Sequence, residues 1–431
     1  MSGPTVETRL ASSDSGSVAA DVAPAGMAPD RSIGSRRPFL ALGLIALAHA
    51  AIHAQSALMP LIYPLIIREY ALDASAIGIF IAVSSFVGGS MQLAYGFLTR
   101  WIARPLLLGG GQLLFGAGLL LSSLANGVPQ LLGAISAARV GASPQHPVGN
   151  AVLSDAFPAE RRGFAISAHI SGGNVGTILV PFVAGGLLAV FGWQGTLALF
   201  GVPSIVIGLL IALAIREDGA RYRRQARATG SVSAQVGQVM RRRDIQLILG
   251  ASLIAAGGRG LDIVAPFMVL YLTGPLGFSD EETRLLYGLL LVGAVVGPLL
   301  AGWLSDHFGR RRTLVTYYAL SAAGILAFLA AGANLVLLIP LLLPFGTAVF
   351  SESPVLQAYL ADRAAGPMRD VAFSVYFTFA FGIGAFWAFV IGFVADAFGY
   401  PVAFGVMAAS YLAAALLVLA VRERREAPLG A

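Results

Sequence analysis

Cysteine and lysine are both absent from this chain of 431 residues. Without cysteine the chain can form no disulfide, no thiolate metal site, no iron–sulfur cluster and no cysteine nucleophile. Without lysine it has no phosphate-binding loop of the G-x-x-x-x-G-K-[ST] type, which argues against ATP-driven transport. Charged residues make up only 12% of the chain, whereas 57% are hydrophobic and the mean hydropathy is +0.79. Soluble domains of this length rarely have such a composition, so the chain is expected to lie in a lipid bilayer.

Long apolar stretches separated by short polar breaks recur from Phe39 onward. Each is long enough to cross about 30 Å of hydrocarbon as a helix that rises about 1.5 Å per residue. Residues 1–38 are rich in Ser, Ala, Gly and Pro, which predicts a disordered tail, and the apolar stretch that follows is too long for a signal peptide. Twelve spans are predicted, at residues 39–67, 76–98, 106–125, 130–153, 164–190, 193–215, 245–273, 285–304, 313–331, 335–360, 371–395 and 402–421.

The positions of the arginines predict the orientation of the chain, because positively charged loops stay in the cytoplasm. Most of the 28 basic residues, all of them arginine, fall in the tails and in alternate loops, whereas the opposite loops hold only Arg68 and Arg284. Both termini are therefore predicted to be cytoplasmic. The predicted domains are a cytoplasmic tail (1–38), an N-terminal six-helix half (39–215), a basic cytoplasmic connector that we expect to be solvated (216–244), a C-terminal six-helix half (245–421) and a second cytoplasmic tail (422–431).

The two halves resemble each other in sequence. The run HPVGNAVLSD, which ends at Asp155, aligns without a gap with SPVLQAYLAD, which ends at Asp362, at an offset of 207 residues. Parallel repeated halves, with a binding site between them near the bilayer midplane, are typical of one large class of secondary transporters. Further pairs, at an offset of 206 residues, are Pro60 with Pro266, Gly96 with Gly302 and Arg104 with Arg310.

The stretch GWLSDHFGRRR, residues 302–312, begins at the end of the eighth predicted span. It resembles the cytoplasmic loop signature G-x-L-x-D-x-x-G-R-R of the major facilitator superfamily. That resemblance implies an all-α membrane protein with twelve transmembrane helices in two pseudo-symmetric six-helix bundles. In such a motif glycine permits a tight turn, the aspartate can reach a neighbouring helix end, and the arginines lie at the cytoplasmic face. The residues that match this gating motif are Gly302, Asp306, Gly309, Arg310 and Arg311.

A second, narrower resemblance covers parts of the first half. His53, Gln145-His146-Pro147 and the run GFAISAHISGGNVGTILVPFVAG at 163–185 look like fosmidomycin-resistance-type members of the same superfamily. Such members have an acid after the His-Pro pair, where Val148 stands here, and commonly Gly-Pro in place of Val180-Pro181. The resemblance implies proton-driven export of a drug or a small polar metabolite.

Few ionisable residues lie inside the predicted spans, and each is a candidate site because a charge at the bilayer centre costs at least about 2.5 kcal/mol. The repeat places Arg259 and His53 at equivalent points, and both are expected to face a central cavity. A guanidinium matches carboxylate, phosphate or phosphonate groups, so Arg259 is predicted to bind the substrate; the alternative is that it only pairs with Asp262. The other predicted substrate ligands are His53, Arg139, Gln145, His146 and His169, and a structural anchor is the alternative for Arg139.

Glu352 aligns with Gln145 across the repeat. A buried carboxylate can accept a proton near neutral pH, because burial disfavours its charged form. Glu352 and Asp262 are therefore predicted to couple transport to protons. His53 and His146 are alternative proton carriers, and structural hydrogen bonding between helices is the other interpretation of these side chains.

These observations and resemblances favour a proton-coupled secondary transporter of a bacterial inner membrane that exports a small anionic or zwitterionic compound by alternating access. Uptake of a small organic anion is the alternative, and a membrane sensor without transport is a more distant one. No H-E-x-x-H or G-x-S-x-G pattern occurs, so an enzyme is not expected. The expected partners are the substrate, protons and the lipid bilayer; no nucleic acid, cofactor or metal is expected, and the chain is expected to act as a monomer.

Overall fold

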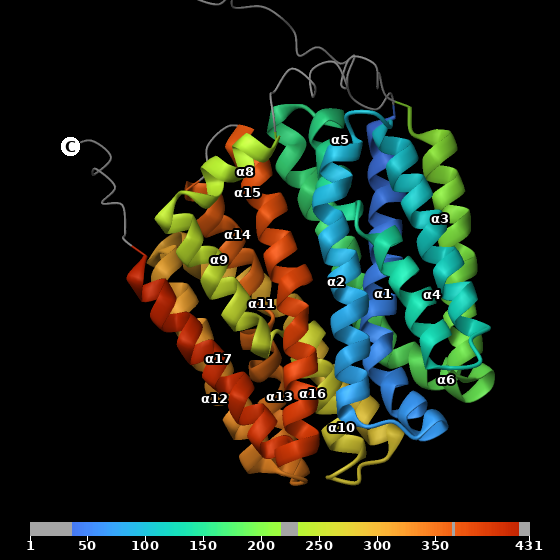
Figure 1. Cartoon of the computed structure of the whole chain (residues 1–431), viewed down its shortest axis with the longest axis vertical. Helices are drawn as coiled ribbons and strands as arrows, with labels where there is room; N and C mark the ends of the chain where they lie inside the picture. Colours follow the sequence, from blue (N-terminus) through green and yellow to red (C-terminus); the bar gives the residue numbers. More distant parts are fainter. Residues whose placement is uncertain (1–36, 217–231, 364–366, 422–431) are drawn as a thin grey trace, which may run out of the picture. The chain divides into compact units, whose positions relative to one another are not determined.

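The computed structural model describes residues 37–216, 232–363 and 367–421, which belong to a single unit of the chain, 32–431. These described ranges are helical and contain no strand (Figure 1). The α-helices are α1 (Pro38–Tyr70), α2 (Ala74–Leu98), α3 (Arg104–Ser123), α4 (Val128–Ala142), α5 (Asn150–Ala156), α6 (Ala159–Ala214), α8 (Val232–Met240), α9 (Arg243–Ala255), α10 (Ala265–Thr273), α11 (Asp280–Phe308), α12 (Arg310–Ala331), α13 (Leu335–Val349), α14 (Glu352–Arg363), α15 (Pro367–Phe377), α16 (Phe386–Phe398) and α17 (Tyr400–Ala420). Short π-helical or 3-10 turns lie at η1 (Gln145–Gly149), η2 (Ala256–Gly258), η3 (Gly260–Val264), η4 (Thr378–Gly382) and η5 (Ile383–Ala385).

Ten helical stretches are long and apolar enough to cross a membrane. One of them, Arg161–Ala214, contains the fifth and sixth predicted spans, which meet at Gly192, where a φ of +63° turns the chain. The fourth predicted span is divided among α4, η1 and α5, and none of these is long enough by itself. The other nine stretches correspond one to one with predicted spans. The predicted all-α membrane fold is therefore confirmed.

The fourth and tenth spans are interrupted at equivalent points of the two halves. Helix α4 ends at Ala142 and α13 ends at Val349, which are 207 residues apart in the sequence. Pro147 and Pro354, also related by the repeat, follow each interruption. Proline removes a backbone donor and clashes with the preceding turn, so a helix is weakened at such a position. The repeat in sequence therefore appears in the backbone as a shared irregularity.

Two buried or half-buried ion pairs repeat in the same way. Arg104 of α3 lies 2.8 Å from Asp155, and its side chain is only 1% exposed. Arg310 of α12 lies 3.2 Å from Asp362 in the second half. The repeat relates Arg104 to Arg310 and Asp155 to Asp362. The two bundles therefore use the same contact to join the start of one helix to the end of another.

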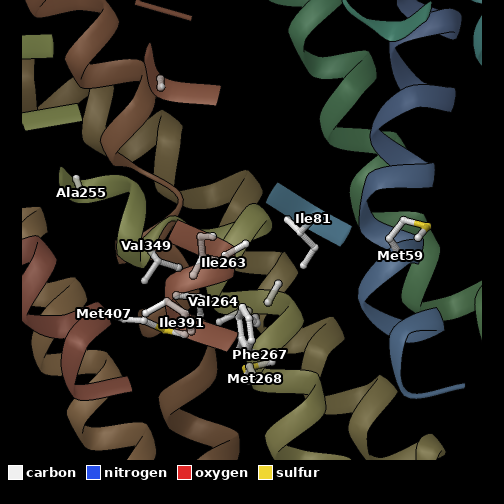
Figure 2. Packing of buried hydrophobic residues seen from close by; sticks show 14 of the residues in the cluster. Met59, Ile81, Ala255, Ile263, Val264, Phe267, Met268, Val349, Ile391 and Met407 are labelled. Atoms are coloured by element: carbon white, nitrogen blue, oxygen red, sulfur yellow. The ribbon is translucent and has the colours of Figure 1, made fainter. Parts of the chain in front are cut away.

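Apolar packing continues from one half into the other. A single cluster of buried side chains includes Met59 of α1 and Ile81 of α2 together with Ile263, Phe267 and Ile391 of the second half (Figure 2). Helix α2 runs beside α16 (Figure 1). The outward faces carry large apolar side chains that remain exposed, among them Leu121, Val190, Leu213, Leu299 and Val336. Such faces suit a hydrocarbon solvent, since lipid replaces water around them.

The connector 216–244 contains a short helix that was not predicted. Helix α8 lies within this segment, packs against α15 and buries Val239. Helix α8 carries apolar residues at helical spacing, which explains its packing; the expectation of a solvated connector stays a prediction. Residues 217–231 of the connector, most of the first tail and the second tail lie outside the described residues.

Candidate functional site

The seventh span loses helical geometry at Arg259. The turn η2 ends just before Arg259, and η3 begins directly after it. Arg259 has a φ of −61° and a ψ of 131°, which are the angles of an extended chain. Glycines flank the break on both sides, and a Cβ added at Gly258 would collide with the ring of Tyr411. The backbone here therefore packs too closely for a larger residue, and Arg259 is the one side chain that projects from the interruption.

The guanidinium of Arg259 is occupied by groups of the C-terminal half. Its Nε donates to Oε1 of Glu352 at 2.9 Å, and its terminal nitrogens donate to the carbonyl oxygens of Ala380 and of Ser252, the latter at 3.2 Å. The Cζ atom of Arg259 lies 4.9 Å from the centroid of the Phe381 ring. The predicted alternative in which Arg259 pairs with Asp262 is wrong, because the described ion pair of Arg259 is with Glu352, across 93 residues of sequence.

Glu352 begins α14, directly after the interruption of the tenth span. The side chains of Arg259 and Glu352 are only 8% and 3% exposed. Oε2 of Glu352 is buried and has no hydrogen-bond partner in the described part of the chain. A buried ion pair is favourable only when its remaining donors and acceptors are satisfied. Glu352 meets this condition at Oε1, which accepts from Arg259, but not at Oε2.

A small pocket lies where α1, α2 and α4 of the first half face η3 and α10 of the second. Arg139 comes from α4 and Asp262 from η3, so the pocket carries one cation and one anion on opposite halves. Nε of Arg139 is buried and has no hydrogen-bond partner among the described residues. The remaining lining residues are Ser56, Met59, Pro60, Tyr63, Ile81, Leu261 and Pro266. Pro60 and Pro266 are equivalent in the repeat, so the pocket lies close to the symmetry axis of the two halves.

Four histidines gather inside the N-terminal half. His49 and His53 come from α1, His146 from η1 and His169 from α6. The ring of His49 stacks on His169 with centroids 4.2 Å apart, and it meets His53 and His146 edge to face at 4.4 Å and 5.0 Å. The ring of His146 also stacks at 5.6 Å on Phe377 of α15, so the cluster adjoins the second half.

The structure therefore divides the predicted site residues into three groups. Arg259 lies with Glu352, Arg139 shares a pocket with Asp262, and His53, His146 and His169 lie together. Gln145 is buried with both amide atoms unpaired among the described residues, and a Cβ on Gly149 would meet both Gln145 and His169.

His49 was not among the predicted substrate ligands or proton carriers, although it is the central ring of its cluster. The signal in the sequence was its spacing: His49 and His53 are four residues apart, which places them on one face of a helix. Tyr63 and Ser252 were also missed. Neither has a distinguishing pattern, since their roles follow from which helices pack beside them.

The predicted gating motif lies at the junction of α11 and α12. Gly309 has a φ of +89° between the two helices, a conformation that glycine adopts at little cost. Asp306 forms an ion pair with Arg310, the first residue of α12. Arg310 also contacts Asp362, and Arg311 donates to the carbonyl oxygen of Leu419 at 2.5 Å. The motif therefore joins the α11–α12 junction to the C-terminal ends of α14 and α17.

Polar contacts join the two halves at the end of the bundle that carries the α1–α2 connection. Arg68 lies 2.9 Å from Asp280, and Arg284 donates to the carbonyl oxygen of Pro181. Asp396 of α16 accepts hydrogen bonds from the first two backbone amides of α2, at 3.1 Å and 2.6 Å. A carboxylate at a helix N-terminus is stabilised by the free amides and the helix dipole. One half thus caps a helix of the other, which holds this end closed.

Comparison with known proteins agrees with this geometry. The sequence model of the Major Facilitator Superfamily matches residues 44–260 and 248–431. The fosmidomycin resistance protein of Escherichia coli (strain K12) is 25% identical over 364 residues, which cover 84% of this chain and 88% of that protein. The 4-hydroxybenzoate transporter PcaK of Pseudomonas aeruginosa is 25% identical over 304 residues, covering 63% of this chain and 67% of that protein.

A solved structure shares the fold. The crystal structure of a D-xylose–proton symporter superposes with a TM-score of 0.73 at 15% sequence identity, covering 89% of this chain and 97% of that one. The family match extends over both halves, and the repeated bundles, the interrupted spans and the loop motif are features of the chain itself. The chain therefore belongs to the Major Facilitator Superfamily, and it is a multi-pass membrane transporter of small substrates rather than an enzyme.

Proposed function

We propose that this transporter couples to protons and exports a small anionic or zwitterionic metabolite or drug by alternating access. The observation that carries the proposal is the pocket between the halves, in which Arg139 and Asp262 stand on opposite sides. A buried donor without an acceptor is costly, so Nε of the half-buried Arg139, which has no partner among the described residues, favours an anionic ligand group. A carboxylate on the other wall favours a cationic group in the same molecule.

Arg139 is a better substrate ligand than Arg259. The donors of Arg259 already serve Glu352, Ala380 and Ser252, so a ligand would have to displace protein groups from it. Arg139 offers Nε without such competition. The proposed roles of Gln145, His53, His146 and His169 in substrate binding stay predictions, because none of these four residues is among those that line the pocket.

Glu352 is the proposed proton carrier, with Asp262 as the second candidate. A proton on Glu352 would remove the charge that attracts Arg259 and weaken their ion pair. Arg259 also binds the carbonyl oxygen of Ala380 in η4, and η4 packs against α2 of the other half. Protonation at Glu352 is thereby connected, through Arg259, to a surface at which the two halves meet.

The proposed orientation follows from the arginine distribution. If both termini are cytoplasmic, then the α1–α2 connection faces the periplasm of a bacterial inner membrane. The contacts of Arg68, Arg284 and Asp396 would then close the periplasmic side. Breaking them and closing the opposite end would complete the transport cycle, with the chain acting as a monomer.

Export is favoured by the similarity to the fosmidomycin resistance protein, which extends over most of both chains. The similarity to a 4-hydroxybenzoate transporter favours the alternative, uptake of a small organic anion. Fosmidomycin and 4-hydroxybenzoate are both small molecules; the first is a phosphonate and the second a carboxylate. Export and uptake therefore both imply a substrate with an anionic group. A sensor that binds such a molecule without transporting it is the more distant alternative.

The test uses Arg139→Ala and Arg139→Lys in purified full-length protein, with fosmidomycin and 4-hydroxybenzoate as probes. We expect at least one probe to raise the unfolding temperature of the wild type, and we expect Arg139→Ala to lose this shift because its anion ligand is gone. Arg139→Lys keeps the charge and should retain part of it. The flux of the same probe into or out of proteoliposomes under an imposed proton gradient distinguishes the transporter from a sensor and gives its direction. Unchanged binding and flux in Arg139→Ala would contradict the proposal.

A further inference from the structure

Three of the clustered histidines are arranged as ligands of one metal ion. One ring nitrogen from each of His49, His53 and His146 lies within 4.8 Å of the others. A tetrahedral zinc ion with Zn–N bonds of about 2.0–2.1 Å holds its nitrogens about 3.3 Å apart, so the three side chains would move closer together on binding. The three side chains come from two separate segments, α1 and η1, that the fold brings together.

The hydrogen bond of His49 determines which of its two ring nitrogens carries the hydrogen. Its Nδ1 lies 3.0 Å from the carbonyl oxygen of His169, which can only accept, so Nδ1 carries the hydrogen. In the neutral ring Nε2 then holds a free lone pair. This Nε2 is buried and has no partner in the part of the chain that the structure describes. A buried acceptor without a donor is unfavourable, and a metal ion would satisfy it.

His53 is prepared in the same way. Its Nδ1 lies 3.3 Å from Oγ1 of Thr177, and that hydroxyl donates its own hydrogen to the carbonyl oxygen of Gly173 at 3.2 Å. Oγ1 must therefore accept from Nδ1–H, which leaves Nε2 of His53 with its lone pair. Metal-binding histidines usually donate the second ring nitrogen to a carbonyl or another outer group, which fixes the tautomer. Here His169 and Thr177 supply those outer groups.

We propose that His49, His53 and His146 bind a divalent transition-metal ion of the zinc class inside the N-terminal half. Imidazole ligands suit Zn²⁺, Co²⁺, Ni²⁺ and Cu²⁺, whereas Mg²⁺ and Ca²⁺ require oxygen ligands. Three histidines leave a fourth coordination position open. His169 stacks on His49, and both of its ring nitrogens are unpaired among the described residues. The ion would tie α1 to η1 and to the face that meets Phe377.

The experiment measures metal binding directly, on full-length protein purified with a histidine-free tag and stripped with a chelator. Co²⁺ is the spectroscopic probe and Zn²⁺ the competitor. We expect one equivalent of Co²⁺ to give d–d absorption bands typical of nitrogen coordination, Zn²⁺ to abolish them and Mg²⁺ to leave them unchanged. Binding should weaken in acid, because the ligands must be neutral imidazoles.

His49→Gln, His53→Gln and His146→Gln are each expected to weaken Zn²⁺ binding by at least tenfold. Thr177→Val, which removes only the outer group, should weaken it by about 10–100-fold. His307→Gln is the matched control, since His307 lies on α11 outside the cluster and should bind metal like the wild type. The unfolding temperature without metal checks that each variant is folded. If the variant of the buried His49 does not fold, His146→Gln tests the site instead, because His146 is only half-buried.

Equal Zn²⁺ affinity in the wild type and in all three cluster variants would overturn the proposal, as would the absence of stoichiometric binding to the wild type. The readout needs no transported substrate. Its failure is therefore distinct from failure of the proposed transport function, which depends on Arg139, Asp262 and Glu352.

Discussion

The two arginines that lie inside predicted spans, Arg139 and Arg259, differ in what surrounds them. Arg259 has a carboxylate partner, a carbonyl acceptor in η4 and an aromatic ring over its face. Arg139 lines a pocket with a donor left over. A buried charge that is fully paired serves the structure or responds to the protonation of its partner, whereas one that is incompletely paired can bind an outside anion. Neither role follows from residue type, because both are arginines inside apolar spans.

At the same scale, Glu352→Gln tests proton coupling. Glutamine mimics the protonated side chain at every pH, so we expect ligand binding to remain while transport loses its dependence on the proton gradient. Gradient-driven flux in proteoliposomes should fall by at least about tenfold, which corresponds to about 1.4 kcal/mol. Glu352→Asp, which keeps the charge, is the matched control.

Wild-type flux and an unchanged pH profile in Glu352→Gln would remove Glu352 as the proton carrier. Asp262→Asn is then the next variant to measure, because Asp262 is the remaining acidic candidate and lies in the pocket itself.

At the scale of elements, the irregular turns mark the places where the halves meet. The turn η4 in the eleventh span packs against α2, and a Cβ added at Gly89 of α2 would collide with backbone atoms of Phe381 and Gly382. Backbone cannot rotate away as a side chain can. Glycine at this position therefore permits an approach that any larger residue prevents.

Gly89→Leu is expected to separate α2 from η4 and so to disfavour the state with closed contacts between the halves. Overpacking of this kind costs about 1–3 kcal/mol, enough to shift a conformational equilibrium by about fivefold or more. Transport should be strongly reduced. Gly110→Leu in α3 is the control, because a Cβ there meets no atom within 4 Å. Equal flux in the two variants, measured at equal protein levels, would show that this contact does not limit the cycle.

At the scale of the whole molecule, alternating access requires opposite movements at the two ends of the bundle. The chain has no cysteine, so pairs of introduced cysteines carry spin labels without background. Asn126 and Ala333 lie in exposed turns, after α3 and after α12, at the end with the α1–α2 connection. Ala156 and Ala361 lie at the other end, at the C-terminal ends of α5 and α14.

We expect acidification with a bound probe to lengthen the distance between labels at Asn126→Cys and Ala333→Cys and to shorten that between Ala156→Cys and Ala361→Cys, as measured by double electron–electron resonance. The contacts of Arg68, Arg284 and Asp396 must break for the first change to occur. A label pair within one half, Asn126→Cys with Val190→Cys, should not change. If both inter-half distances move in the same direction, rigid-body alternation of these halves is the wrong description.

The amino-acid sequence by itself determined the membrane fold, the twelve spans, the repeat and the family motif. Each span must be apolar over its own length to lie in hydrocarbon, so local composition carries this information. Only the tertiary structure decided which polar groups meet. Arg259 pairs with Glu352 rather than with its near neighbour Asp262, and His49 joins His169 across 120 residues. Such contacts depend on how each helix is rotated and where its turns η1 to η4 interrupt it, and packing between distant segments sets both.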